Sequence, residues 1–513
     1  MSMTLLHATT LWQLLERRAA LTPHASMLID GRKHLHMSFA QALDIAERLA
    51  AGFHERGIVA GSQVTWMLPT GLPAVVTALA LARLGALQNP IISLYGEREV
   101  HGIVERNHSS FLLVPESGER DFPAMAERLC QQLEQPPQVI VMGSQLPRGR
   151  ASSLPAPPAD GQVVRWVYYT SGTTSQPKGA CHTDESLMIG GRNLARSMNV
   201  TAADVGSVAF PYAHIGGAMY TTMLLASGMS AVLLDRFQAQ EAAEIYRRYA
   251  VTLAGGSTAH YQLLLAEQRQ QAQTPLLPGM RLLCGGGAPK PPELYYQVRN
   301  EIGCGLIHNY GMTEVPLICA GFEADTDEQL ANADGVPMQD IELRIIRSDG
   351  SLAGEGESGE IRVRGNAVFK GYSDPALNVA SFDDDGFFRT GDLGMRRTDG
   401  RIVLTGRLKD VIIRKGENIS AKEIEDLLFT HPKVAAVAVI GLPDELRGER
   451  VCAVVELKPG VPALQFEEMV DYFMQAEVMR QKIPEQLEIV EQLPRNQTLN
   501  KILKHVLREQ YAH

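Results

Sequence analysis

The sequence predicts an α/β protein with a large N-terminal domain of parallel-type sheets covered by helices, a β-rich subdomain, and a small α+β C-terminal domain. Strand-like and helical runs alternate through the first part of the chain, short strands with Asp-Gly turns begin near residue 341, and a compact α+β pattern begins near residue 409. Alternating strands and helices favour parallel sheets, and Asp-Gly turns favour antiparallel hairpins. The predicted domains are residues 1–408 and 409–513.

The N-terminal pattern contains runs with the lengths of ordinary helices and strands. Helical spacing of apolar residues predicts helices at 11–18, 38–56 and 74–84. Short apolar or β-branched runs predict strands at 63–68, 163–169, 231–234 and 281–283. A Pro-rich stretch at 153–161 predicts a surface loop.

The remainder of the chain is richer in strands. Strands are predicted at 341–346, 359–364, 401–405, 411–414, 434–440 and 451–457. Helices are predicted at 421–429, 467–474 and 501–508. Ser420 and Glu423 have the spacing of a capping box, which would open the first of these helices.

Composition argues against several classes of protein. The chain has 513 residues, of which 45% are hydrophobic and 21% charged, as in an ordinary globular protein. The formal net charge of −10 argues against a nucleic-acid or anionic-membrane binder. The 6 cysteines are scattered without a CxxC pair, which is typical of reduced thiols in the cytoplasm. We identify no secretory leader, and the apolar stretches, interrupted by Arg83 or by Thr and Ser within 218–234, predict buried elements rather than membrane spans.

The strongest local signal is the segment 169–179, YTSGTTSQPKG, in which a predicted strand runs into a loop of hydroxyl side chains and glycines. Hydroxyls and backbone N–H groups suit phosphate oxygens, glycines allow close approach, and Lys178 adds a positive charge. A polar surface loop is the alternative for such a composition. The segment does not fit a P-loop, because no Gly precedes Lys178 and Gly179 follows it.

This segment resembles the phosphate loop of the adenylate-forming superfamily, which includes acyl-CoA synthetases, peptide-synthetase adenylation domains and luciferases. Ser175 stands where Gly is commoner in the family. Further segments resemble family motifs in family order: GGGAP at 285–289, NYGMTE at 309–314, TGD at 390–392, GRLKD at 406–410 and KGEN at 415–418. Each motif is weak alone, and together they identify the chain as a member of this superfamily.

The resemblance implies that a carboxylate attacks the α-phosphate of ATP, releases pyrophosphate and forms an acyl-adenylate. Both reactants are anionic, so the site must neutralise charge as it develops. Glu314 would hold Mg²⁺, which prefers oxygen ligands, and Thr313 would donate to the α-phosphate. The resemblance assigns ATP binding to Thr170, Ser171, Gly172, Thr173, Thr174, Lys178, Gly287, Ala288, Pro289, Asn309, Tyr310, Gly311, Met312, Asp392 and Arg407.

Some of these side chains would have a defined partner within the nucleotide. Tyr310 would stack on adenine, Asp392 would accept both ribose hydroxyls, and Arg407 would contact ribose or phosphate. Taken alone, each acidic or aromatic residue has a structural alternative. Tyr310 could be a half-buried core aromatic, Asp392 a turn residue, and Glu314 a helix-start or surface carboxylate. The family context favours the functional interpretation.

The resemblance also assigns a catalytic lysine and a hinge. The family ending is usually PRTxxGKxxK, and here residues 494–504 read PRNQTLNKILK, with one extra residue and Asn500 in place of Gly. Alignment on Lys-Ile-x-Lys selects Lys501 as the catalytic lysine and leaves Lys504 on the following helix. Lys409 matches the hinge about which family enzymes rotate a mobile C-terminal lid domain between two half-reactions.

Coenzyme A is the expected acyl acceptor, because Lys415 and Gly416 resemble the loop that passes the pantetheine thiol. Charge for the CoA phosphates could come from Arg414, Lys415, Lys422, Arg447 and Arg450. Transfer to a separate carrier protein is the alternative, and a regulatory nucleotide-binding protein that has lost catalysis is a third interpretation. The expected partners are thus a carboxylic acid, ATP and CoA, without nucleic acid, and a homodimer is left open.

For the acid, residues 210–217, FPYAHIGG, resemble the segment beside the acyl pocket. Domains that activate amino acids generally place an Asp here, and none is present, so an amino acid is not expected. His214 matches a position that gates the pocket, or is a satisfied buried histidine. Gly216, Gly217 and the glycines at 285–287 would leave space for a bulky or long apolar chain. A fatty acid of medium or longer length is slightly favoured over alicyclic, steroid-like and aromatic acids.

Overall fold

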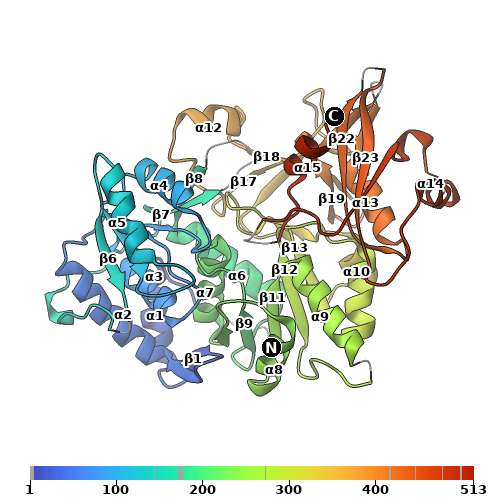
Figure 1. Cartoon of the computed structure of the whole chain (residues 1–513). Coiled ribbons are helices and arrows are strands. Elements are labelled where there is room, and N and C mark those ends of the chain that lie inside the picture. Colours follow the sequence, from blue (N-terminus) through green and yellow to red (C-terminus); the bar gives the residue numbers. More distant parts are fainter. Residues whose placement is uncertain are drawn as a thin grey trace.

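The computed structural model describes residues 5–143, 145–170, 177–271, 273–414, 417–444, 446–476, 478–496 and 500–512. Within these residues, two sheets of mainly parallel strands form the larger part of the molecule (Figure 1). An antiparallel sheet and a C-terminal α+β unit follow them along the chain. The predicted fold class is confirmed.

The first sheet is 6-stranded, in the order β6-β5-β3-β4-β7-β8. Its strands are β3 (Gln63–Trp66), β4 (Leu87–Pro90), β5 (Phe111–Pro115), β6 (Gln138–Met142), β7 (Val164–Thr170) and β8 (Lys178–Thr183). Its pairs are parallel except β7 and β8, which form an antiparallel hairpin. The predicted phosphate loop connects these two strands.

The second sheet is 7-stranded, in the order β13-β12-β11-β9-β10-β1-β2, and only the β1–β2 pair is antiparallel. Its strands are β1 (Ser26–Asp30), β2 (Leu35–Ser38), β9 (Val205–Val208), β10 (Ser230–Leu233), β11 (Leu253–Gly256), β12 (Leu282–Gly286) and β13 (Gly305–Asn309). The carboxyl ends of β11, β12 and β13 lie at one edge, where ligands bind in parallel sheets.

Helices cover these sheets, and two of them are buried along nearly their whole length. These two are α3 (Leu72–Leu84) and α7 (Ile215–Ser227), which are apolar on all sides and therefore pack in the core. The others are α1 (Leu11–Leu21), α2 (Phe39–His54), α4 (Glu97–Arg106), α5 (Phe122–Gln132), α6 (Asp184–Ser197), α8 (Ala239–Arg248), α9 (Thr258–Gln270), α10 (Pro292–Gln297) and α11 (Asp327–Asn332). No helix among the described residues is both long and apolar enough to cross a bilayer.

The predicted β-rich subdomain is a 4-stranded antiparallel sheet. It contains β16 (Glu342–Ile346), β17 (Gly359–Arg364), β18 (Phe388–Arg396) and β19 (Ile402–Arg407). A two-stranded ribbon of β14 (Cys319–Ala320) and β15 (Val336–Pro337) precedes it, and α12 (Ala376–Ser381) lies between β17 and β18. Gly350 and Gly400, with φ of 84° and 80°, occupy the predicted Asp-Gly turns, where glycine adopts positive φ without strain.

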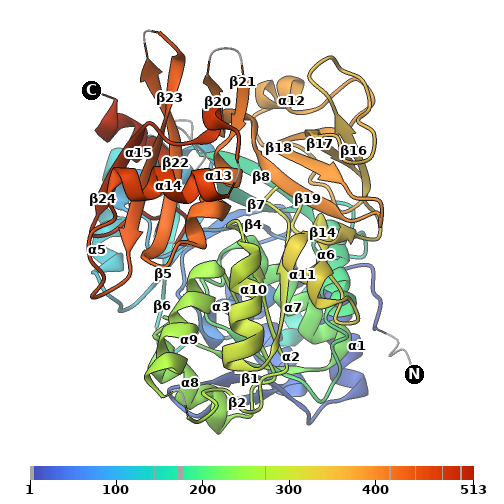
Figure 2. The ribbon, with the colours of Figure 1, turned by 90° about the vertical axis from the view of Figure 1, so that its right-hand side faces the viewer.

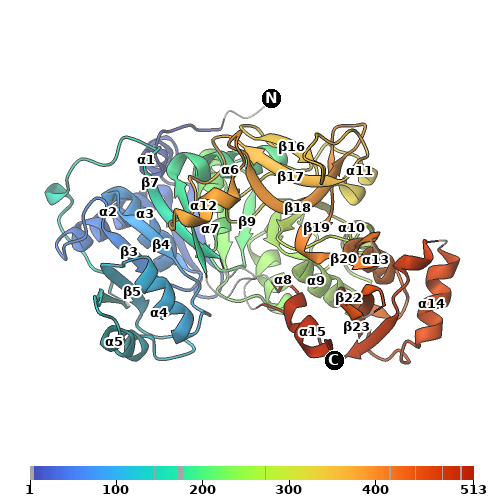
Figure 3. The same ribbon diagram turned by 90° about the horizontal axis from the view of Figure 1, so that it is seen from above.

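The segment from β20 to α15 has a core of its own and is called the C-terminal region below. Its elements are β20 (Val411–Arg414), β21 (Glu417–Ser420), α13 (Ala421–Phe429), β22 (Val434–Asp444), β23 (Gly448–Leu457), α14 (Phe466–Gln475), β24 (Gln486–Val490) and α15 (Lys504–Tyr511). Figure 2 shows this region beside the antiparallel sheet, with α8 and α9 toward the lower end of the view. Seen from above, α14 lies at its outer edge (Figure 3).

Two details of the C-terminal region differ from the prediction. The last helix begins at Lys504 rather than at 501, because Asn500 has a left-handed backbone and Ile502 forms a bridge with Arg495. At the start of α13, Ser420 accepts from the Glu423 backbone, but the Glu423 side chain pairs with Lys482 instead of completing the capping box.

Candidate active site

An ion pair between Asp392 and Arg407 lies at the centre of the site. The two residues face each other on β18 and β19, and Arg407 Nε lies 2.7 Å from Asp392 Oδ1 in an ion pair. Tyr310, directly after β13, donates its hydroxyl to Asp392 Oδ2 at 3.0 Å. Asp392 is 4% exposed, and a buried carboxylate needs such partners. Because a carboxylate offers about four lone-pair positions, Asp392 could still accept the hydroxyls of a diol.

The ring of Tyr310 is buried rather than open for stacking. It is 5% exposed and packs in a core cluster with Val315 and Phe369. Burial and the neighbouring Asp392 carboxylate raise the pKa of the Tyr310 phenol well above its usual value. This geometry fits the structural alternative of a core aromatic and adds a role in holding Asp392. Stacking on adenine stays a prediction.

Glu314 and Lys178 meet at Tyr372. The Tyr372 hydroxyl donates to Glu314 Oε1 at 2.5 Å, and Lys178 Nζ lies 5.4 Å from the centroid of the Tyr372 ring. Since Glu314 follows Tyr310 by four positions, the structure brings Lys178, Glu314 and the Tyr310–Asp392 pair together in one site. The sequence pattern gave no signal for Tyr372, because a single tyrosine in a loop is common.

The predicted phosphate loop is described only at its ends. Thr170 at the end of β7 pairs with Lys178 at the start of β8. Other predicted site residues lie outside the described part of the chain: Ser171, Gly172, Thr173, Thr174, Lys415 and Gly416. Their roles stay predictions.

The segment that carries Thr313 is a tight turn. Met312 N–H donates to the Val315 carbonyl at 2.9 Å, and Val315 N–H donates back to the Met312 carbonyl at 3.2 Å. A Cβ on Gly311 would lie 2.3 Å from the Pro316 carbonyl oxygen, so a side chain does not fit there. The turn therefore fixes the direction in which Thr313 and the following carboxylate leave the backbone.

His182 is a further residue that positions this turn. It lies on β8 and is fully buried, and its Nε2 donates to the Thr313 carbonyl at 2.7 Å while Nδ1 lies 3.0 Å from Ser186 Oγ. Burial lowers the pKa of His182 to about 4, so the ring is neutral and Nε2 carries the proton that the carbonyl accepts. His182 thereby ties the strand after the phosphate loop to Thr313. No sequence motif distinguishes it from an ordinary core histidine.

The glycines at 285–287 do not leave the space expected for an acyl chain. A Cβ on Gly285 would lie 1.7 Å from the Gly256 carbonyl oxygen, and one on Gly286 would lie 2.4 Å from the Asn309 carbonyl oxygen. Gly287 has a φ of 82°. Close backbone approach and a left-handed turn, rather than room for substrate, therefore explain these glycines.

The loop after β12 is fixed from β13. His308 Nε2 donates to the Ala288 carbonyl at 2.7 Å, which orients the loop leading to Pro289. Asn309 Nδ2 donates to Cys284 Sγ at 3.2 Å, whereas Asn309 Oδ1 is buried without a hydrogen-bond partner. An unsatisfied acceptor of this kind is rare in proteins and indicates a place for a donor from a ligand or water.

The predicted acyl segment lies at the N-terminus of α7. His214 caps this helix, because its Nδ1 accepts from Gly216 N–H at 3.2 Å, and burial lowers the pKa of His214 to about 4. A Cβ on Gly216 would lie 3.3 Å from the Phe210 ring, so this glycine does adjoin an aromatic wall. A Cβ on Gly217 would lie 1.9 Å from the Tyr212 carbonyl oxygen. Gly217 is therefore explained by helix packing rather than by space for the acid.

Lys501 lies near enough to the ion pair for Arg407 and Asp392 to act on its charge, and its catalytic role stays a prediction. Burial and the positive charge of Arg407 lower the pKa of Lys501 to about 8, and Asp392 acts in the opposite direction. The backbone of Lys501 pairs with Asn496, whose N–H donates to the Lys501 carbonyl at 2.8 Å. Asn500 has a φ of 57°, a left-handed conformation that Gly or Asn adopts readily. This conformation explains why Asn can stand in place of the family's Gly.

The predicted hinge lies directly after Arg407. Lys409 is the middle residue of a 3₁₀ turn, Leu408–Asp410, between β19 and β20. Arg508 of α15 donates to Asp410 Oδ1 at 2.8 Å, which ties the last helix to this turn. Burial and the neighbouring Arg407 lower the pKa of Lys409.

The cations proposed for the CoA phosphates are largely engaged with protein groups. Arg414 donates to Glu485 Oε1 at 2.5 Å, and Arg447 lies 3.0 Å from the same oxygen. Lys422 pairs with Asp426, and Arg450 donates to the Pro443 carbonyl at 2.8 Å. In this conformation these side chains are not an open phosphate site.

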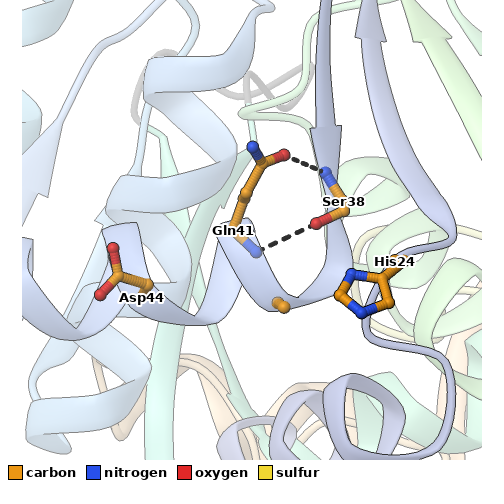
Figure 4. Close-up of a pocket in the computed structure, with 5 residues that line it drawn as sticks. His24, Ser38, Gln41 and Asp44 are labelled. Atoms are coloured by element: carbon orange, nitrogen blue, oxygen red, sulfur yellow. Dashed lines mark hydrogen bonds between the residues drawn. The ribbon is translucent and has the colours of Figure 1, made fainter.

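A separate surface pocket lies at the start of α2, far along the chain from these residues. Figure 4 shows Ser38 and Gln41 forming a capping box, with hydrogen bonds of 2.8 Å and 3.2 Å, between His24 and Asp44. Because these polar groups satisfy the helix end, they are explained by the fold.

Comparison with known proteins agrees with this geometry. The family model "AMP-binding enzyme" matches residues 15–373, and "AMP-binding enzyme C-terminal domain" matches residues 423–499. The chain is 30% identical over 484 residues to a medium-chain fatty-acid–CoA ligase of Escherichia coli (strain K12), covering 91% of this chain and 85% of that protein. It is 33% identical over 482 residues to a salicyl-AMP ligase/salicyl-S-ArCP synthetase of Mycobacterium tuberculosis, covering 90% of this chain and 83% of that protein.

Solved structures are similar over nearly the whole chain. ATP-bound MatB from Rhodopseudomonas palustris has a TM-score of 0.88 and 26% identity, covering 99% of both chains. MenE, the o-succinylbenzoate CoA synthetase of Bacillus subtilis in complex with its acyl-adenylate, has a TM-score of 0.83 and 27% identity, covering 98% of this chain and 99% of that chain. The predicted class of enzyme, an AMP-forming acid–thiol ligase, is confirmed. The chain belongs to the AMP-binding enzyme family, the adenylate-forming superfamily, and to its acyl-CoA ligase branch.

Proposed function

We propose that this enzyme converts a carboxylic acid, ATP and CoA into acyl-CoA, AMP and pyrophosphate through an acyl-adenylate. The observation that carries this proposal is the convergence of Lys501 with Asp392 and Arg407 beside the Glu314–Tyr372 pair. These residues come from separate segments of the chain. Together they would bind an anionic nucleotide and neutralise its charge.

The site residues divide the work of the first half-reaction. The buried Asp392 carboxylate, held by Arg407 and the Tyr310 hydroxyl, would accept the ribose hydroxyls and fix the nucleotide. Lys501 would place its ammonium against the negative charge that develops between the acid and the α-phosphate. A cation placed in advance where this charge develops stabilises the transition state.

Magnesium and ATP fit the residues present. Glu314 presents a carboxylate with one oxygen bound to the Tyr372 hydroxyl and the other available to an ion. A single carboxylate suits Mg²⁺, which takes most of its ligands from phosphates and water. Bound Mg²⁺ would neutralise phosphate charge. Support comes from MenE of Bacillus subtilis, whose structure contains ATP and magnesium, at 28% identity and a TM-score of 0.83.

The acid is proposed to be fatty or otherwise bulky and apolar. Phe210 beside Gly216 supplies an aromatic wall, and the E. coli relative acts on medium-chain fatty acids by name. Because backbone packing explains Gly217 and the glycines at 285–287, these residues no longer argue for a long acyl chain. The buried Oδ1 of Asn309, which has no hydrogen-bond partner, could accept a hydrogen bond from a polar group of the acid. The acid panel should therefore include alkyl, aryl and hydroxyaryl members of matched size.

The test is acid-dependent release of pyrophosphate across this panel, with and without CoA. The proposal requires at least one acid that supports both pyrophosphate release and CoA-dependent formation of a thioester. Pyrophosphate release without CoA transfer would favour the alternative, loading of a separate carrier protein, which the salicyl-AMP ligase relative illustrates. Absence of release with every acid would favour a nucleotide-binding regulatory role.

Other predictions accompany this proposal. The division at 408/409 coincides with the 3₁₀ turn before β20, and we propose it as the boundary about which the C-terminal region moves. Residues 415 and 416 remain the proposed passage for the CoA thiol. A cytoplasmic location and a homodimer stay predictions.

The rate of adenylate formation should depend on the protonation of Lys501. Because the pKa of Lys501 is lowered to about 8 and the ammonium is the active form, kcat/KM should be highest below pH 8 and fall about tenfold per pH unit above it. The measurement is pyrophosphate exchange between pH 6 and pH 10. Lys501→Arg, which stays charged in this range, should retain some activity and lose the alkaline fall. A wild-type profile that is flat to about pH 10 would contradict the assignment.

A further inference from the structure

A group of largely buried charges lies where the C-terminal region rests on β19. Two belong to the N-terminal part of the chain. Lys290 is 6% exposed and donates from Nζ to the Ala331 carbonyl at 2.6 Å. Asp334 accepts from the Leu404 N–H of β19 at 2.8 Å through Oδ2. Neither belongs to the active site described above.

The other two charges belong to α13. Lys422 and Asp426 form an ion pair one turn apart, and their side chains are only 17% and 28% exposed. The helix starts on β19, because Ser420 Oγ donates to the Thr405 carbonyl at 2.5 Å. Thr405 directly follows Leu404, the residue that Asp334 holds. The four charges form a set that we call the ion cluster: Lys290, Asp334, Lys422 and Asp426.

The members of the ion cluster influence one another across the boundary. Burial lowers the pKa of Lys290 to about 8, while Asp334 and Asp426 act to raise it. Burial raises the pKa of Asp334, and Lys422 and Lys290 oppose that change. For Lys422, burial is outweighed by the carboxylates of Asp426 and Asp334, and its pKa is raised. Across the boundary Lys422 thus attracts Asp334 and Lys290 attracts Asp426, while the like charges Lys290 and Lys422, and Asp334 and Asp426, repel each other.

We propose that the ion cluster holds the C-terminal region in the conformation in which Lys501 reaches the Asp392–Arg407 pair. The proposal rests on the proposed function, in which this conformation forms the acyl-adenylate. The cluster members are positioning residues, since among the described residues none of them forms a hydrogen bond or ion pair with Asp392, Arg407 or Glu314.

The physical reason is the attraction between Lys422 of the C-terminal region and Asp334 of the N-terminal part, which exists only while the two parts are docked. If the C-terminal region rotates about Lys409, α13 leaves β19 and carries Lys422 and Asp426 with it. Asp334 and Lys290 then lose their cross-boundary partners. Burial disfavours the charged forms of Lys290, Asp334 and Asp426, whereas the two carboxylates outweigh burial at Lys422 and raise its pKa, so the attraction between Lys422 and Asp334 is the part of the cluster that favours the docked conformation. Losing one charge should shift the balance toward the rotated conformation.

The test measures the two half-reactions separately in Lys422→Met and Asp334→Asn. Met keeps the apolar stem of Lys422, and Asn keeps an acceptor for the Leu404 N–H. Each change should slow pyrophosphate exchange about tenfold, and thioester formation from supplied acyl-AMP should be unchanged or faster. The double variant should be no slower than the slower single variant, because both changes break the same interaction.

The matched control is Lys433→Met, which removes another ion pair from the same region. Lys433 Nζ lies 2.6 Å from Glu468 Oε2 on α14, at the outer edge of the C-terminal region (Figure 3). Both half-reactions of this control should match wild type. Equal slowing of both half-reactions in Lys422→Met, an equal effect of the control, or multiplicative effects in the double variant would overturn the proposal.

A distance measurement separates this proposal from the proposed function. Spin labels at the exposed positions Glu105 and Glu467 report the separation of the two parts in the ATP-bound protein, with the partly exposed Cys130 and Cys181 replaced by Ser. Lys422→Met should add a second distance population that is weaker or missing in the labelled protein with Lys422 intact. Identical distributions would overturn the ion-cluster proposal even if the acid is unknown. If Lys422→Met shifts the distance distribution but no acid in the panel supports pyrophosphate release, the result would count against the proposed function and not against the ion-cluster proposal.

Discussion

Lys501→Ala should slow acyl-adenylate formation by about 10²–10³-fold and leave thioester formation from supplied acyl-AMP nearly unchanged. Lys501 lies beside Arg407 and Asp392, where its ammonium can meet negative charge that appears only as the acid attacks ATP. An interaction made only in the transition state changes the rate rather than substrate binding. The measurements are acid-dependent ATP–pyrophosphate exchange and AMP release from synthetic acyl-AMP with CoA, both at pH 7, where Lys501 is mostly protonated.

Lys504→Ala is the matched control, since the family pattern contains both lysines. Lys504 begins α15, and its Nζ lies 2.7 Å from Glu425 Oε1, within the C-terminal region. The side chains of this pair are 18% and 14% exposed, but its loss removes no charge from the Asp392–Arg407 pair, so it should change the two half-reactions to the same extent. A larger loss of exchange in Lys504→Ala than in Lys501→Ala would reverse the alignment. Equal losses in both half-reactions of Lys501→Ala would remove its specific role in adenylation.

The sequence predicted best those elements whose limits depend on local chemistry. The helix Ala421–Phe429 and the strands Val411–Arg414 and Gly359–Arg364 have the predicted bounds. Their ends are marked by a helix cap or by glycine turns, which act within a few residues. The β-rich subdomain could also be predicted from the sequence, because each Asp-Gly turn requires positive φ at its glycine.

The sequence could not predict features that depend on distant backbone. The glycines at 285 and 286 appeared to leave substrate space, yet neighbouring strands fill it. Lys422 appeared to be a free cation for CoA, yet it is paired with Asp426 beneath the boundary between two parts of the chain. For the two glycines the deciding neighbour is contributed by another segment, so spacing along the chain carries no information about it. For Lys422 the partner is on the same helix at i,i+4, a spacing that the sequence does show, and only the burial of the pair could not be predicted.

The site residues also divide into those that the sequence predicted and those that it missed. Motif order predicted that Lys178, Glu314, Asp392 and Lys501 share one nucleotide site. Lys178 and Glu314 both adjoin Tyr372, and Lys501 lies near Asp392, while the nucleotide role of all four stays a prediction. The residues that connect them were missed: Tyr372 binds Glu314, and His182 binds the Thr313 carbonyl. A connecting tyrosine or histidine has no fixed spacing from the residue it holds, since the contact is made only after folding.

Lys409→Pro should preserve pyrophosphate exchange and reduce CoA thioester formation on the order of 100-fold. Lys409 occupies a 3₁₀ turn, whose φ of about −50° to −70° matches the value that proline fixes. The conformation that brings Lys501 to Asp392 is therefore compatible with proline, whereas a rotated conformation that needs another φ is not. Exchange reports the first half-reaction, and thioester formation from supplied acyl-AMP reports the second.

The comparison with Lys409→Ala separates torsion from charge. Alanine removes the same ammonium, which lies near Arg407, but leaves φ free to change. If rotation about this residue is the requirement, alanine should retain thioester formation that proline loses. Unimpaired thioester formation in Lys409→Pro would show that the hinge lies elsewhere. Equal loss in the proline and alanine variants would assign the effect to the Lys409 charge.

The ion cluster and the hinge have opposite effects on the same motion, because the cluster stabilises the docked conformation and the hinge permits departure from it. Combining Lys422→Met with Lys409→Pro should consequently restore much of the lost exchange, since a fixed hinge no longer needs the cluster to keep Lys501 in place.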